Sequence, residues 1–459
     1  MQKPEKPAAP PAAGRAGRRV HIITFGCQMN EADSELIAAS FLKRGFELTA
    51  ELKTADAVVV NTCTVRQRAE DKAISQIGRL RKWKDSHPEG KLFVVGCAAE
   101  KLGGKIIKNR FPFVDEVVGA KSIDSMDEIV GRMNGETGRQ PDCAAIQPSS
   151  HPAAKSPSRL AVQPPSPLTV SPPSCPTVSS FVTIMRGCSL KCSYCIVPAV
   201  RGPAAFLPAE TILEDAAAKL RAGAREIVLL GQTVNAWRRG KTAFAGLLKK
   251  VLALPGLERL RFMSPHPLYF DDGFFSLFRD NPKIARHMHL PAQSGSDRIL
   301  KAMRRGYTRA QYLDLVSKIR KAAPGSAVST DFIVGYPGES EADFKETLSL
   351  VGESGVSFAY CFKYSRRLDE PGLAPDLGES EIEERLERLL AEVKKNSGDI
   401  LNKRIGRIEE VLLEAEDYGR TSANFVVRLD RKTGLIPGSL VRMEITGVHK
   451  NTLKGRLIP

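Results

Sequence analysis

Apolar runs of strand length alternate with stretches of helical periodicity over the first third of the chain. The strand candidates are residues 20–25, 57–60, 92–95 and 114–118, and the helix candidates are residues 31–43 and 72–83. Strands and helices in alternation need crossover connections, which make the strands parallel and place helices on both faces of the sheet. The pattern therefore predicts an α/β domain with a parallel sheet.

The same alternation continues on a larger scale over residues 181–362. The strand candidates are residues 181–185, 227–230, 260–263, 287–290, 327–334 and 356–361, and helical stretches between them include 211–221, 297–303 and 309–322. Six β/α units without a seventh or eighth predict a partial (β/α)6 barrel. Its active face is expected at the carboxyl ends of the strands, where the βα loops gather.

Three changes in composition mark boundaries in the chain. Residues 1–19 carry a net charge of +4 and no apolar stretch, which predicts a disordered basic tail and disfavours a transit peptide. Residues 141–178 are rich in Pro and Ser and predict a linker. Near residue 400 a charged helical run gives way to short apolar segments that predict a small antiparallel β-barrel. These segments are residues 408–413, 425–429, 440–445 and 453–458.

The charge balance favours a polyanionic partner. The 459 residues include 68 Lys and Arg against 52 Asp and Glu, a net charge of +16, so nucleic acid is preferred over a membrane surface. No apolar run approaches the roughly 18–20 residues that cross a bilayer. Nine cysteines, an odd number without a secretory signal, indicate reduced thiols and a cytoplasmic location.

Three cysteines lie on one short loop after the first strand of the predicted barrel. Cys188, Cys192 and Cys195 form a C-x3-C-x2-C run. Three thiolates can bind three irons of a [4Fe–4S] cluster and leave the fourth iron open to a substrate or cofactor. A structural zinc site is the alternative, but it needs four ligands, and no nearby His or Cys completes this one.

Three further cysteines are dispersed, and each follows a predicted strand. Cys27, Cys63 and Cys97 would all fall at the carboxyl edge of the parallel sheet, where ligands bind in open α/β folds. The pattern therefore predicts that they converge in space. Buried structural thiols are the alternative for each cysteine taken singly. Cys143 and Cys175 in the linker and Cys361 in a strand are left without a role.

The motifs around both sets of cysteines resemble one family. The C-x3-C-x2-C loop on a partial barrel resembles the signature of radical S-adenosylmethionine (SAM) enzymes. The segments around the dispersed cysteines resemble the N-terminal domain of the radical SAM methylthiotransferases, most closely the branch that acts on tRNA. The matching segments are 26–30, 61–66, 95–98, 230–235, 290–297, 303–308 and 330–339. Departures from the family pattern occur at Thr233, at Ser264-Pro265 and at 203–205, and none of them removes a cysteine.

The resemblance implies a domain plan, cofactors and partners. Residues 20–140 would form the methylthiotransferase domain, 179–400 the radical SAM domain and 401–459 a TRAM-like RNA-binding domain. The cofactors would be SAM and two [4Fe–4S] clusters, one on Cys27, Cys63 and Cys97 and the other on Cys188, Cys192 and Cys195. Expected partners are a tRNA anticodon stem-loop and an electron donor such as flavodoxin or ferredoxin, with the chain a monomer. Candidate cofactor-binding residues are Gly231, Gln232, Gln293, Ser294 and Gly335.

The implied reaction is methylthiolation of C2 of N6-isopentenyl (dimethylallyl) adenosine at position 37 of tRNA. A deoxyadenosyl radical made from SAM would abstract the hydrogen, the second cluster would deliver sulfur, and a second SAM would methylate it. Alternatives within the family are threonylcarbamoyl adenosine in tRNA or a ribosomal protein as substrate. An alternative of another class is a non-enzymatic iron–sulfur regulator that binds RNA.

Overall fold

The chain divides into two structural units, residues 1–174 and 175–459. The computed structural model describes residues 17–65, 67–133, 168–170, 177–367, 373–431 and 434–458. The predicted basic tail and linker, with Cys143 and Cys175, lie almost wholly outside the described residues. Residues 168–170 are an exception, because they form a strand where the linker interpretation expected none.

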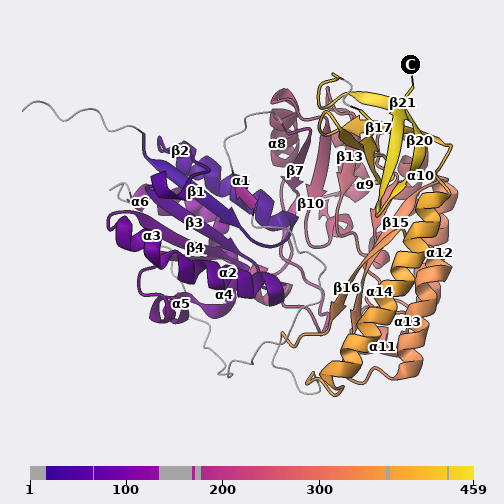
Figure 1. Cartoon of the computed structure of the whole chain (residues 1–459), viewed down its shortest axis with the longest axis horizontal. Coiled ribbons are helices and arrows are strands. Elements are labelled where there is room, and N and C mark those ends of the chain that lie inside the picture. The colour runs from indigo at the N-terminus through magenta and orange to yellow at the C-terminus, as the bar shows by residue number, and fades with distance from the viewer. Residues whose placement is uncertain are drawn as a thin grey trace, which may run out of the picture. The chain divides into compact units, whose positions relative to one another are not determined.

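The first unit is a parallel sheet covered by helices on both faces (Figure 1). Its strands, in the order β2-β1-β3-β4-β5, are β2 (Glu47–Leu48), β1 (Arg19–Thr24), β3 (Ala57–Thr62), β4 (Lys91–Gly96) and β5 (Glu116–Gly119). Its helices are α1 (Gln28–Leu42), α2 (Gln67–Arg79), α3 (Arg81–Ser86), α4 (Cys97–Leu102), α5 (Gly104–Arg110) and α6 (Met126–Met133). The short strand β6 (Leu168–Val170) pairs antiparallel with β1.

Alternation along the strands explains the two helical layers. Val59 packs with α1 and α6, whereas its neighbours Val58 and Val60 pack with α2 to α5 on the opposite face. The expected parallel α/β domain is therefore confirmed. One helix prediction was partly wrong, because the helix predicted over 72–83 is divided into α2 and α3 at Leu80. β2 was also missed, since two residues give no periodic signal.

The second unit contains all six predicted parallel strands. β7 (Ser179–Thr183), β10 (Glu226–Leu230) and β13 (Arg259–Phe262) form one sheet in the order β13-β10-β7, and β14 (His287–His289), β15 (Ala327–Val334) and β16 (Phe358–Lys363) form the other. A parallel bridge between Leu260 and Ile284 connects β13 to the segment before β14. Short strand pairs are β8 (Met185–Arg186) with β9 (Ala205–Phe206) and β11 (Arg238–Arg239) with β12 (Thr242–Ala243).

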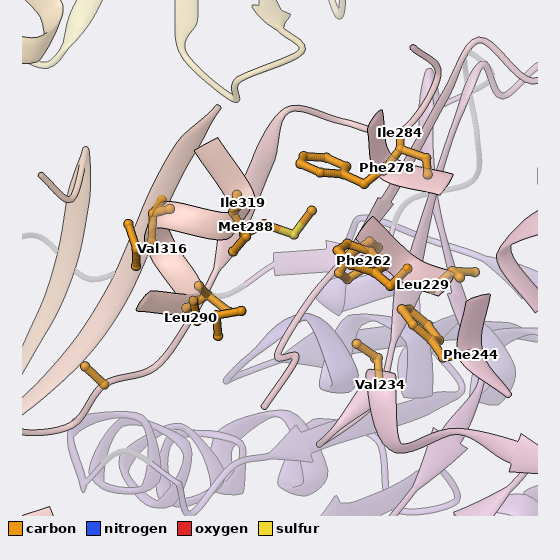
Figure 2. Packing of buried hydrophobic residues seen from close by; sticks show 14 of the residues in the cluster. Leu229, Val234, Phe244, Phe262, Phe278, Ile284, Met288, Leu290, Val316 and Ile319 are labelled. Atoms are coloured by element: carbon orange, nitrogen blue, oxygen red, sulfur yellow. The ribbon is translucent and has the colours of Figure 1, made fainter. Parts of the chain in front are cut away.

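Helices cover one face of these strands and enclose the main core (Figures 1 and 2). They are α8 (Ala209–Arg221), α9 (Phe244–Leu252), α10 (Asp272–Asp280), α11 (Asp297–Ala302), α12 (Arg309–Ala322), α13 (Glu341–Ser354) and α14 (Glu379–Asn402), whereas the short α7 (Val197–Arg201) contributes no residue to this core. Figure 2 shows Phe244 beside Phe262, whose rings meet edge to face at 5.2 Å. Single-turn 3-10 helices are Leu52–Thr54, Val234–Ala236 and Pro267–Tyr269, and a longer one is Ala120–Ser125.

A closed five-stranded barrel follows α14 and ends the chain. Its strands are β17 (Ile408–Leu413), β18 (Tyr418–Thr421), β19 (Val426–Leu429), β20 (Leu440–His449) and β21 (Thr452–Leu457). The prediction of a small barrel is confirmed, but the barrel is not wholly antiparallel, because β19 pairs parallel with β21. The sequence missed β18, whose four residues are too few and too polar to show alternation. No helix among the described residues is long and apolar enough to cross a membrane.

Two candidate cysteine sites

The dispersed cysteines lie where three neighbouring strands end. Cys27 precedes α1 after β1, Cys63 follows β3, and Cys97 is the first residue of α4 after β4. Because β1, β3 and β4 are adjacent and parallel, their carboxyl ends share one edge of the sheet. Cys63 and Cys97 are both buried, with 1% of their surface exposed, and Cys27 is half-buried.

The three thiols interact with one another. The pKa of the Cys63 thiol is raised well above its usual value by a hydrogen bond with Cys27, by burial, and by the charges that Cys27 and Cys97 would carry. Gly26 makes this approach possible, since a Cβ there would lie 2.5 Å from the Cβ of Cys63. Three thiols this close together repel one another when they ionise, and bound iron would compensate that negative charge. Thiolates are the protein ligands of iron–sulfur clusters, so the site suits such a cluster.

Two buried asparagines hold the first two of these loops in place. Asn30 Nδ2 donates to Asn61 Oδ1 at 3.0 Å and to the Thr62 carbonyl at 2.9 Å, and Asn61 Nδ2 donates to the Asn30 carbonyl at 2.8 Å. Since Asn30 lies in the first turn of α1 and Asn61 near the end of β3, the pair fixes Cys27 relative to Cys63. The expected convergence thus has a structural cause in the flanking residues.

The compact cysteine motif lies on a loop between β8 and α7. Cys188 and Cys192 are buried, and Cys195 is half-buried. Burial, aided by the charges that the neighbouring Cys192 and Cys188 would carry, raises the pKa of the Cys195 thiol to about 12. Gly187, with φ of 71°, precedes them, and a Cβ there would lie 2.2 Å from the Pro203 carbonyl oxygen.

Hydrogen bonds anchor this loop to α11 and to the segment that follows β15. The Ser193 amide donates to the Met303 carbonyl at 3.2 Å, and its hydroxyl donates to the Ala302 carbonyl at 3.0 Å. The same hydroxyl lies 2.7 Å from the Tyr336 hydroxyl. The loop is therefore held at the C-terminus of α11 and at the carboxyl end of β15, as expected for a site on the active face.

Two side chains lie within hydrogen-bond distance of the sulfurs of the compact motif, and Arg305 is the donor to its sulfur. Thr233 Oγ1 lies 3.5 Å from Cys188 Sγ, and Arg305 Nη1 lies 3.5 Å from Cys192 Sγ. Sequence reasoning noted Thr233 only as a departure from the family pattern and placed Arg305 in a matching segment without a role. Their roles depend on contacts between loops that lie far apart in the sequence, which no local pattern reveals.

The donor chemistry of both sites, three thiols each, suits an iron–sulfur cluster. Within the described part of the chain, no group of three or more His, Cys, Asp or Glu side chains is arranged to hold one metal ion. A single zinc ion needs ligands that converge on one centre, whereas each cysteine of a [4Fe–4S] cluster binds a different iron. Three-thiol sets without a fourth ligand fit clusters with an open iron.

Two of the candidate cofactor residues follow β10. Gly231 packs against Met185, since a Cβ there would lie 2.3 Å from Met185 Cγ. Gln232 has a buried Oε1 that finds no hydrogen-bond partner among the described residues. A buried amide oxygen without a partner is costly, which makes Gln232 available to a ligand at this face.

The other three candidates have structural partners. Gln293 adopts the left-handed backbone conformation, with φ of 73°, and its backbone N–H donates to the Asp331 carbonyl at 2.8 Å. Ser294 Oγ lies 3.3 Å from Thr347 Oγ1. Gly335 donates to Glu339 Oε2 at 2.8 Å, and a Cβ there would lie 2.7 Å from Ile382. These contacts give each of the three residues a structural role, and their contact with a cofactor remains a prediction.

Family comparisons match both units. Residues 182–351 match the Radical SAM superfamily, and residues 19–119 match the family described as Uncharacterized protein family UPF0004.

The radical SAM structure TsrM from Kitasatospora setae, with cobalamin and a [4Fe-4S] cluster bound, aligns with a TM-score of 0.51 at 13% identity, covering 76% of this chain and 75% of that one. OxsB, a cobalamin-dependent radical enzyme with SAM bound, aligns with a TM-score of 0.51 at 12% identity, covering 83% and 56%. These likenesses show the fold. The chain is thus a radical SAM protein, a class that uses SAM and an iron–sulfur cluster.

Curated relatives narrow the class. A protein of Methylacidiphilum infernorum is 39% identical over 89% of this chain and 88% of its own length, and one of Anaeromyxobacter sp. is 37% identical over 98% and 95%. Both are named tRNA-2-methylthio-N(6)-dimethylallyladenosine synthase. The chain belongs to the family of these synthases, which confirms the resemblance drawn from the cysteine motifs.

Proposed function

We propose that this chain methylthiolates C2 of N6-dimethylallyladenosine at position 37 of tRNA. The observation that carries the proposal is the presence of two separate three-cysteine sites in a chain of this family. An aromatic C–H bond lies beyond the acid–base chemistry of side chains, so cofactors must supply the radical and the sulfur. The names of the relatives favour a tRNA nucleoside over a ribosomal protein as substrate.

The two sites would hold two [4Fe–4S] clusters. Cys27, Cys63 and Cys97 would hold one, and Cys188, Cys192 and Cys195 would hold the other, whose open iron would bind SAM. When bound, these groups supply the electron for SAM cleavage and the sulfur for the product. The chain buries most of these thiols and holds the loops that carry them through Asn30, Asn61 and Ser193.

Side chains at the active face would bind SAM or the adenine base. Gln232 Oε1 and His266 Nε2 are buried, and neither has a hydrogen-bond partner in the part of the chain that the structure describes. Burial, aided by Arg305, lowers the pKa of His266 to about 3. Its imidazole is therefore neutral near pH 7 and can form a hydrogen bond without adding charge. Gly231, Gln293, Ser294 and Gly335 would shape the same pocket.

The terminal barrel would bind the RNA as a TRAM-like domain. Residues 401–459 hold 11 basic and 7 acidic side chains, a net charge of +4. Unstacking the target adenosine from the anticodon loop would expose C2 to the active face. The chain would act as a cytoplasmic monomer and take electrons from a flavodoxin-like or ferredoxin-like donor.

Mass analysis of tRNA nucleosides tests the substrate. Deletion of the gene should abolish 2-methylthio-N6-dimethylallyladenosine and leave its precursor to accumulate. Restoring the wild-type chain should recover the product, and a Cys192→Ala chain should not. Unchanged product in the deletion strain would refute the proposal, and loss of a methylthiolated threonylcarbamoyl adenosine instead would support the alternative substrate. A reduced, iron-loaded chain that never cleaves SAM would support the non-enzymatic regulator.

A further inference from the structure

Arg305 lies buried beside the compact cysteine loop. Its side chain belongs to the segment between α11 and α12, and only 5% of the residue is exposed. Nη1 donates to Cys192 Sγ at 3.5 Å and to the Tyr194 hydroxyl at 3.2 Å. Nε donates to the Tyr307 hydroxyl at 3.1 Å, and Nη2 donates to the Pro291 carbonyl at 3.0 Å. The guanidinium is therefore fixed in one orientation.

The charge of Arg305 has no carboxylate partner among the described residues. Its hydrogen-bond acceptors there are two phenol oxygens, one carbonyl and one cysteine sulfur. Two other buried arginines of this unit differ, since Arg385 lies 3.0 Å from Glu339 and Arg261 lies 3.2 Å from Glu226. A buried cation is costly without a counter-charge. The available negative charge near Arg305 is that of the cysteine thiolates once they bind iron.

We propose that Arg305 is a positioning residue that raises the reduction potential of the cluster held by Cys188, Cys192 and Cys195. The inference rests on the proposed function, because it assumes that these thiolates hold a cluster. One-electron reduction adds negative charge to the cluster, and a fixed cation 3.5 Å from a ligand sulfur stabilises the reduced state more than the oxidised one. Hydrogen bonds to the sulfurs and net charge are among the factors that set cluster potentials.

Thr233 acts on the same cluster from another element. Its hydroxyl lies 3.5 Å from Cys188 Sγ, in the loop after β10, and only 4% of the residue is exposed. A neutral donor stabilises added negative charge less than a cation does. Thr233 therefore contributes in the same direction as Arg305 but to a smaller extent.

A redox titration of the full-length chain tests this role. The protein is reconstituted with iron and sulfide under anaerobic conditions and titrated without SAM, with electron paramagnetic resonance as the readout. The cluster on Cys188, Cys192 and Cys195 is identified as the component whose signal changes when SAM is added. The signal of the other cluster serves as an internal reference, since the variants leave its cysteines intact.

The variants separate charge from packing. Arg305→Gln should lower the reduced-to-oxidised ratio of the SAM-sensitive cluster at least about tenfold at a fixed potential, which is about 59 mV for a one-electron couple. Arg305→Lys should retain most of the wild-type potential, because it keeps the charge. Thr233→Val should shift the potential in the same direction by less. Arg320→Gln is the matched control, since Arg320 donates to the carbonyls of Ser354 and Gly355 and should leave both clusters unchanged.

Several outcomes would overturn the proposal. Arg305→Gln with full iron content and an unchanged potential contradicts it, as does a variant that only weakens SAM binding, which would make Arg305 a ligand of the cofactor. Should Arg305→Gln fail to hold its cluster, Thr233→Val decides, and an unchanged potential there contradicts the role of these donors. A wild-type chain that holds no SAM-sensitive cluster refutes the proposed function itself. A chain with both clusters and normal SAM cleavage but unmoved potentials refutes only this inference.

Discussion

Asn30 and Asn61 join the first helix to the second long strand of the N-terminal sheet through reciprocal hydrogen bonds of 3.0 and 2.8 Å. Both residues are fully buried. Their side chains therefore connect the segments that carry Cys27 and Cys63, and the spacing of these two thiols depends on them.

Asn30→Ala should release the Cys27 loop. Removing the side chain takes the donor away from the buried Oδ1 of Asn61, at a cost of about 1–3 kcal/mol, whereas Asn61 Nδ2 keeps the carbonyl of residue 30 and Ser34 Oγ as acceptors. We expect a lower melting temperature and loss of iron from the N-terminal site, with SAM cleavage retained. Asn109→Ala is the control, because Asn109 is exposed on α5. Full iron content in a folded Asn30→Ala chain would contradict the prediction.

Iron content should separate the two cysteine sites. Reconstituted wild-type protein should hold about eight irons, as two [4Fe–4S] clusters require. Cys63→Ala and Cys192→Ala should each hold about four, but deoxyadenosine formation should disappear in Cys192→Ala alone. Cys361→Ala should keep all of the iron, since Cys361 lies on β16 outside both sites. About four irons in the wild type would leave the N-terminal site unexplained.

Gly187→Ala should disrupt the compact cysteine loop. A Cβ at this position would lie 2.2 Å from the Pro203 carbonyl oxygen, so the backbone must move. We expect loss of the SAM-sensitive cluster. Gly240→Ala is a matched control, because Gly240 also has positive φ, of 54°, but an added Cβ there would meet no atom of the described residues within 4 Å beyond its chain neighbours. That control should cost about 1–2 kcal/mol and keep the cluster.

Arg259→Met should weaken the attachment of the terminal barrel to the strands of the second unit. Arg259 Nη1 donates to the carbonyls of Arg420 at 3.1 Å and Thr421 at 3.3 Å, and it lies 3.6 Å from Glu226. Breaking a buried ion pair costs about 3–5 kcal/mol. In Arg259→Met, Glu226 still keeps its ion pair with Arg261. We expect a lower melting temperature and weaker tRNA binding, with deoxyadenosine formation retained. A wild-type melting temperature would argue against this contact. The exposed Arg279 is the control, and Arg279→Gln should change little.

His287 should make the protein less stable in mild acid. Burial, aided by the charges of Arg261, His289 and Arg420, lowers its pKa well below 6.5. The unfolded chain therefore binds a proton below about pH 6.5 that the folded chain does not, so stability falls as the pH falls through that value. The slope approaches about 1.4 kcal/mol per pH unit for one such group. Denaturant unfolding between pH 7.5 and 5 checks this, and His287→Gln should show a shallower slope than the wild type.

The sequence predicted the longer parallel strands of both units because each is a compact apolar run, and it missed the two-residue β2. It also predicted where the cysteines lie along those strands. It missed β18 and the division between α2 and α3, since four residues and a single break are too short to alter periodicity. The parallel pairing of β19 with β21 depends on closure of the barrel, which no single strand encodes.

By itself, the sequence determined the order of elements, the two sets of three cysteines and the family to which they belong. These are local properties, because periodicity and motif spacing are written in neighbouring residues. Only the tertiary structure decided which side chains surround the thiols. Arg305 reaches the sulfur of Cys192 from 113 residues away, and Thr233 reaches Cys188 from 45 residues away. Those contacts exist because packing of the strands brings distant loop ends to one face, and that convergence is set by the whole core.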